Sequence, residues 1–144
     1  MKRLPSELAG YQEKLFKVDD FIGMVMSGLT ADARVLCKYM RNESLNYKMT
    51  FGSNQPLNRL LGKVADSNFL FTLESQVKTQ RASKRPYGVG LLIAGVDEEG
   101  PHIYETCPSG NFYEYEAYSI GARSQSARTY LEDNFANFKN ASLA

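Results

Sequence analysis

The chain has 144 residues, of which 43% are hydrophobic and 12% aromatic, and this length and composition predict one globular domain with a substantial core. Its formal net charge is +1, with basic residues spread along the chain, which argues against nucleic acid and anionic membranes as partners. No apolar run is long enough to span a bilayer, and the first residues lack the apolar stretch of a signal peptide. We therefore expect an intracellular protein.

Five stretches of the sequence predict β-strands, because each is short, apolar or alternating, and bounded by turn residues. The expected strands are 14–18, 21–26, 88–96, 102–107 and 112–120. The stretch 88–96 is apolar on both faces and predicts a buried central strand. Asp19 and Asp20 suit the turn of a first hairpin, and the last three strands predict an antiparallel meander.

Three amphipathic helices are expected between and after these strands. Their expected caps or first residues are Thr30, Pro56 and Ser124. The first helix carries Asp32 in its first turn, where the helix dipole favours a negative charge, and its apolar spacing continues to a point between Arg41 and Tyr47. Residues 66–84 fit a helix extension, an extra strand or a loop equally well.

The order of strands, helices, strands and helix predicts an α+β layered sandwich rather than alternating parallel βαβ units. The first hairpin and the later meander would supply two partial sheets with open apolar edges. Open edges invite pairing with another chain, so we expect the isolated chain to self-associate.

The sequence contains no assembled active site and no metal or cofactor motif. Cys37 and Cys107 lie far apart and form no CxxC pair. His102 and Cys107 would be roughly 16 Å apart on opposite faces of a strand, at about 3.3 Å per residue, which is too far for a catalytic pair. A Cys37–His102 pair stays open from the sequence alone. No cofactor and no catalytic residue are expected.

Several patterns that could bind a ligand have simpler interpretations. Gly88 and Gly90 lack the third glycine and the strand-to-helix position of a dinucleotide fingerprint. The acidic turn 97–99 is more simply a solvated hairpin turn than a cation site. The tyrosines of 112–118 alternate with glutamates that would repel phosphate, so half-buried strand packing is preferred over base stacking.

Four segments together resemble the alpha subunits of the proteasome core particle. They are 13–20, 27–34, 85–95 and 119–121. Segments 101–109 and 121–132 further resemble one eukaryotic type among the seven alpha subunits. The resemblance covers nearly the whole chain and implies a single domain over 1–144.

The resemblance implies a four-layer αββα sandwich of the N-terminal nucleophile hydrolase type, in which the helices from Thr30 and Pro56 cover one sheet. Alpha subunits of this family form a seven-membered ring stacked on the beta ring that carries proteolysis, and they dock activators. The implied function is a non-catalytic ring subunit in ubiquitin-dependent protein degradation, in the cytoplasm and nucleus. Its partners would be other alpha subunits, the beta ring and the C-terminal tails of activators, with no nucleic acid and no membrane.

The resemblance also implies three binding residues. Lys14 matches the lysine that receives the carboxylate of an activator's C-terminal tail in a pocket between adjacent alpha subunits, a charge-assisted pairing. Gly28 and Leu29 match the backbone and the apolar part of the wall of that pocket.

The sequence also departs from the family pattern. It lacks the gating tail and the first two strands, which would precede Leu4, and it lacks the last helices and closing strands, so the domain is expected to be truncated at both ends. Residues 67–74 look like an insertion that extends the second helix or is poorly ordered.

Two other functions are alternatives to the alpha-subunit interpretation. A beta-type threonine protease uses an N-terminal threonine as nucleophile, but this chain starts at Met1 and its first threonine is Thr30. The other alternative is an unrelated interaction module that binds through its tyrosine-rich strand.

Overall fold

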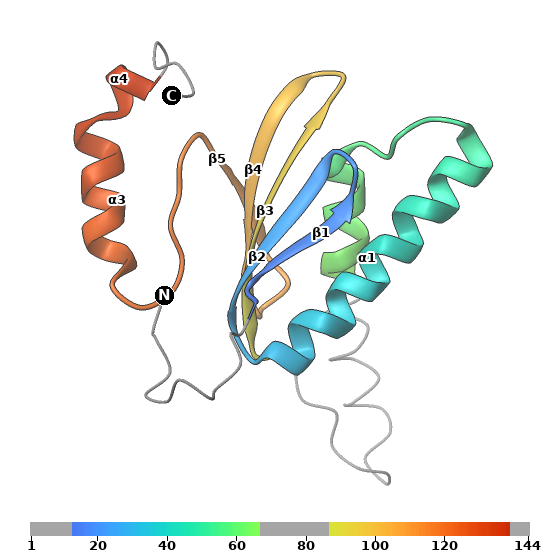
Figure 1. Cartoon of the computed structure of the whole chain (residues 1–144), viewed down its shortest axis with the longest axis horizontal. Helices are drawn as coiled ribbons and strands as arrows, with labels where there is room; N and C mark the ends of the chain where they lie inside the picture. The colour runs from blue at the N-terminus through green and yellow to red at the C-terminus, as the bar shows by residue number, and fades with distance from the viewer. Residues whose placement is uncertain (1–12, 67–86, 139–144) are drawn as a thin grey trace, which may run out of the picture.

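The computed structural model describes residues 13–66 and 87–138, and its elements follow the expected order of strands, helices, strands and helix (Figure 1). The strands are β1 (Leu15–Asp19), β2 (Ile22–Gly28), β3 (Val89–Asp97), β4 (Gly100–Thr106) and β5 (Phe112–Tyr115). The helices are α1 (Thr30–Phe51), α3 (Ser124–Asp133) and α4 (Phe135–Phe138), and residues 57–66 are also helical. The expected insertion at 67–74 lies outside the described residues.

All five strands belong to one antiparallel sheet in the order β1-β2-β3-β4-β5. β2 pairs with β3 along its whole length, from Ile22 opposite Gly95 to Gly28 opposite Val89. The expectation of two partial sheets is therefore wrong for the described residues. The first hairpin and the meander are joined by this pairing, although α1 and the helical residues 57–66 separate them in the sequence.

The hydrophobic core lies between one face of the sheet and the helices that cover it, which are α1 and residues 57–66 (Figure 1). On the sheet side, Met24, Leu91 and Ile93 are at most 1% exposed. On the helix side, Met40 and Leu60 are completely buried. Each such side chain contributes about 1.5–3 kcal/mol relative to an exposed position, so this layer provides much of the stability of the domain.

The opposite face of the sheet is open within the described residues. β3 is central, as expected, but it is buried on one face only: Leu92 is half-buried, Ala94 is exposed, and Val96 is 55% exposed. α3 lies on this open side, away from α1, and none of its residues is buried (Figure 1). The expected burial of β3 on both faces is therefore wrong for the described part of the chain, while the α+β class is confirmed.

The helix ends differ from the expected ones. Leu29, with an extended backbone, occupies the N-cap of α1 in place of Thr30, and its carbonyl accepts the hydrogen bond of Ala33 N–H at 3.1 Å. α1 continues beyond Tyr47 to Phe51, where Gly52 adopts a left-handed conformation and donates to Lys48 O.

The second and third helices also begin differently. The carbonyl of Pro56 accepts from Leu60 N–H at 3.2 Å, so Pro56 precedes the first helical residue. Arg123, with φ 62°, takes the N-cap of α3 in place of Ser124.

β5 ends at Tyr115 instead of continuing to residue 120, because the chain folds back after it. The ring of Tyr115 stacks on that of Tyr118, with centroids 4.0 Å apart. The guanidinium group of Arg128, in α3, lies over the Tyr118 ring, with its central carbon 4.1 Å from the ring centroid. The Nε of Arg128 also donates a hydrogen bond to Ser119 O at 3.0 Å. Burial and the neighbouring Glu105 carboxylate raise the pKa of Tyr118 to about 12, so its hydroxyl stays protonated. These contacts tie α3 to the end of β5.

Candidate functional site

Lys14, Gly28 and Leu29 lie at the same end of the sheet, where β1 begins, β2 ends and α1 starts. Lys14 is exposed immediately before β1, and its carbonyl accepts a hydrogen bond from Met26 N–H at 3.0 Å. Met26 is only two positions before Gly28. The β1–β2 ladder thus brings Lys14 beside the Gly28–Leu29 backbone.

The backbone at Gly28 and Leu29 is held against the start of β3. Gly28 has φ 130° and pairs with Val89, and a Cβ atom at this position would lie 2.4 Å from Gly88 O. Leu29 N–H donates to the same Gly88 carbonyl at 3.0 Å. Because only glycine tolerates this φ and this close approach, the shape of the wall depends on Gly28.

Lys14 differs electrostatically from Lys17, the nearby lysine in β1. Within the described residues no carboxylate forms an ion pair with Lys14, whereas Lys17 pairs with Asp20 at 2.8 Å. The side chain of Leu29 is 50% exposed. An ammonium group and an exposed apolar side chain at one corner suit a chain end that carries a carboxylate and an apolar residue.

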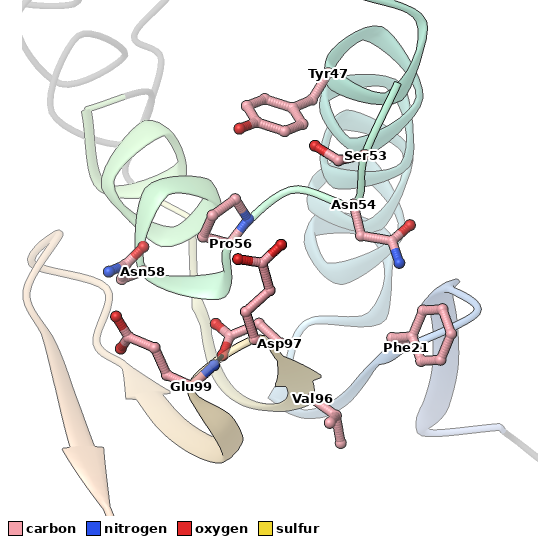
Figure 2. Close-up of a pocket in the computed structure, with 10 residues that line it drawn as sticks. Phe21, Tyr47, Ser53, Asn54, Pro56, Asn58, Val96, Asp97 and Glu99 are labelled. Atoms are coloured by element: carbon pink, nitrogen blue, oxygen red, sulfur yellow. Dashed lines mark hydrogen bonds between the residues drawn. The ribbon is translucent and has the colours of Figure 1, made fainter. Parts of the chain in front are cut away.

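A hollow of about 540 Å³ lies at the opposite end of the sheet, between the two hairpin turns and the end of α1 (Figure 2). Asp97 lines this hollow, and its carboxylate accepts from Leu57 N–H at 3.4 Å and from Glu99 N–H at 3.0 Å. It therefore serves the start of the helical residues 57–66 as well as its own turn. The sequence interpretation of 97–99 as a solvated turn missed this contact, because nothing in the local pattern indicates a partner 40 residues earlier.

Next to this hollow, His102 lies between two carboxylates. Its Nδ1 is 2.5 Å from Glu114 Oε1, and its Nε2 approaches Asp97 Oδ1 at 3.1 Å without the alignment of a hydrogen bond. The hydrogen bond with Glu114, opposed by desolvation and aided by the charges of both carboxylates, raises the pKa of His102. Partial burial works against the ionised form of Asp97, but backbone hydrogen bonds and His102 hold its pKa below the ordinary value.

The described residues show no arrangement for nucleophilic or metal chemistry. His102 is committed to two carboxylates, and burial raises the pKa of both the Cys37 and the Cys107 thiol, so both thiols remain protonated near neutral pH. Among the described residues no group of three or more His, Cys, Asp or Glu side chains could hold a metal ion. In the same part of the chain, no helix is both long and apolar enough to cross a membrane.

Comparison with known proteins identifies the family. A family model described as "Proteasome subunit" matches residues 1–144. The chain belongs to the proteasome subunit family. The predicted resemblance to alpha subunits is confirmed, and several of the similar proteins are named proteasome subunit alpha type-1. Members of this family have the N-terminal nucleophile hydrolase fold, of which the described residues show one sheet and its helices.

Individual proteasome subunits match almost the whole chain. "Proteasome subunit alpha type-1" of Dictyostelium discoideum is 57% identical over 143 residues, which are 99% of this chain and 55% of that protein. The alpha type-1 subunit of Drosophila melanogaster is 50% identical over 137 residues, or 95% of this chain and 47% of that protein. The "Probable proteasome subunit alpha type-6" of Schizosaccharomyces pombe is 47% identical, over 99% of this chain and 50% of that protein. The chain thus spans about half the length of these proteasome subunits.

Proposed function

We propose that the chain is a non-catalytic subunit of the alpha ring of the proteasome core particle. In this role it contacts neighbouring alpha subunits in a seven-membered ring and the adjacent beta ring, and it docks the C-terminal tails of activators during ubiquitin-dependent degradation in the cytoplasm and nucleus. Family membership supports the assignment to the particle. A beta-type protease role is disfavoured, because Thr30 begins α1 and its backbone lies within a helix.

The observation that supports activator docking is the corner formed by Lys14, Gly28 and Leu29. A tail carboxylate can accept a charge-assisted hydrogen bond from the Lys14 ammonium. The exposed Leu29 side chain can contact an apolar residue of the tail, and the Gly28 backbone provides a surface without a side chain. Each of these groups recognises a different part of a chain terminus.

The test is the substitution Lys14→Ala in the assembled core particle, with activator affinity measured by binding of a labelled tail peptide. Loss of a hydrogen bond to a charged group costs about 1.5–3 kcal/mol, so the affinity should fall roughly 10- to 100-fold. Lys17→Ala is the matched control, because Lys17 is an exposed lysine three residues later, in β1, that already pairs with Asp20. Equal affinity of the Lys14→Ala and wild-type particles would count against docking at this corner.

Assembly is tested separately by purifying the tagged chain from cells. Recovery together with other alpha and beta subunits is expected. Recovery of the chain alone would favour the free-standing interaction module instead.

A further inference from the structure

The corner that carries the proposed docking residues is held by a side chain outside it. Asp32, in the first turn of α1, is 9% exposed, and its Oδ2 accepts a hydrogen bond from Gly88 N–H at 2.8 Å. The two residues are 56 positions apart in the sequence. A nearly buried carboxylate thus fixes one peptide group at the start of β3.

The same Gly88 residue is bound on its other side by the docking wall. Its carbonyl accepts from Leu29 N–H at 3.0 Å, and the carbonyl oxygen lies 2.4 Å from the position that a Cβ atom of residue 28 would take. Leu29 in turn accepts the first hydrogen bond of α1, from Ala33 N–H at 3.1 Å. The contacts form a closed ring, from the Asp32 carboxylate through Gly88 to Leu29 and back along α1.

We propose that Asp32 is a positioning residue for the docking wall: through Gly88 it holds the Gly28–Leu29 backbone in the conformation that receives the tail. This inference rests on the proposed docking function of Lys14, Gly28 and Leu29. Asp32 does not touch the tail itself. It acts because its carboxylate oxygen accepts the hydrogen bond of Gly88 N–H and so restrains the Gly88 peptide.

This closed set of contacts predicts different effects for the substitutions Asp32→Asn and Asp32→Ala. Asp32→Asn keeps one side-chain oxygen that can accept from Gly88 N–H, while it loses the charge and the second acceptor oxygen. Asp32→Ala removes the acceptor, leaves a partly buried N–H group without its partner, and releases Gly88 from one side. A role confined to the negative charge at the start of α1 would instead make the two variants equally defective.

The experiment uses the assembled core particle that contains this subunit. Its probe is a fluorescent octapeptide with an apolar residue before a free C-terminal carboxylate, and the amidated peptide is the control ligand. Binding is measured by fluorescence anisotropy. On the same particles, hydrogen exchange read by mass spectrometry follows the peptides that contain Leu29 and Gly88. Lys48→Gln is the matched control variant. It removes the ion pair between Lys48 Nζ and Asp19 Oδ1, 3.3 Å apart, which joins the far end of α1 to the sheet.

With Asp32→Ala we expect roughly tenfold weaker binding of the carboxylate peptide and roughly tenfold faster exchange in the Leu29 and Gly88 peptides. Asp32→Asn should stay within about threefold of the wild type in both measurements, and Lys48→Gln should leave both unchanged. Wild-type affinity in the Asp32→Ala particle, or equal losses in the Ala and Asn variants, would overturn the positioning role alone. Failure of the wild-type particle to prefer the carboxylate over the amidated peptide would overturn the docking function, and the positioning role with it.

Discussion

Gly28→Ala is the substitution whose effect on the free energy of unfolding follows most directly from the structure. The added Cβ atom would lie 2.4 Å from Gly88 O, although real Cβ contacts essentially never fall below 3.0 Å. The residue also has φ 130°, which costs a side-chain-bearing residue about 1–2 kcal/mol. Relief of the clash must move Gly88 and weaken its 3.0 Å bond from Leu29 N–H, at about 0.5–1.5 kcal/mol. The free energy of unfolding should therefore fall by about 1.5–3.5 kcal/mol.

Urea denaturation measures this loss of stability. In the same assay, substitutions at two other glycines separate the contribution of the close contact with Gly88 from that of the positive φ. Gly52 also has a positive φ, 70°, but nothing lies within 4 Å of its added Cβ, so Gly52→Ala should cost only about 1 kcal/mol. Gly23 is in the same strand as Gly28, has no positive φ and would make only an ordinary contact at 4.0 Å. Gly23→Ala should therefore be neutral or slightly stabilising, by up to about 1 kcal/mol. If Gly28→Ala were no more destabilising than Gly52→Ala, the argued clash with Gly88 would be refuted.

Two further predictions concern the remainder of the sheet. Because Glu114 and Asp97 raise the pKa of His102 above 6.5, the stabilisation by protonated His102 should be complete below that pH and lost as the pH rises through the raised pKa. Urea denaturation at about pH 6 and about pH 9 should show this loss, and an unchanged pH dependence in His102→Gln would contradict it. Ile93→Ala should lower the free energy of unfolding by about 2–5 kcal/mol because Ile93 is fully buried, as checked by the same assay. Val96→Ala, at a 55% exposed position of the same strand, should cost less than about 1 kcal/mol, and equal losses would contradict the one-sided burial of β3.

Local patterns in the sequence predicted most of the elements. The strand and helix periods depend on neighbouring residues, and they correctly indicated the first hairpin, α1, the meander and α3. The helix caps were less predictable. Thr30 is a better N-cap residue than Leu29 by intrinsic preference, but the bond from Leu29 N–H to Gly88 places the cap one residue earlier.

The candidate site was predicted from resemblance, and its physical support came from residues far apart in the sequence. Lys14, Gly28 and Leu29 were named because they match a family pattern, and the structure places them at one corner. Their role in activator docking stays a prediction. Asp32 was expected only as a favourable charge in the first turn of α1, since no local signal indicates that its partner is Gly88.

The sequence by itself determined the type and order of the elements, because hydrophobic periodicity and turn residues act over a few positions. Only the tertiary structure decided how these elements combine. It joined the two strand groups into one sheet through β2 and β3, left one face of β3 open, and brought Asp32 to Gly88 and Asp97 to Leu57. These contacts close loops of 40 residues or more, so they depend on the packing of the whole domain rather than on any local pattern.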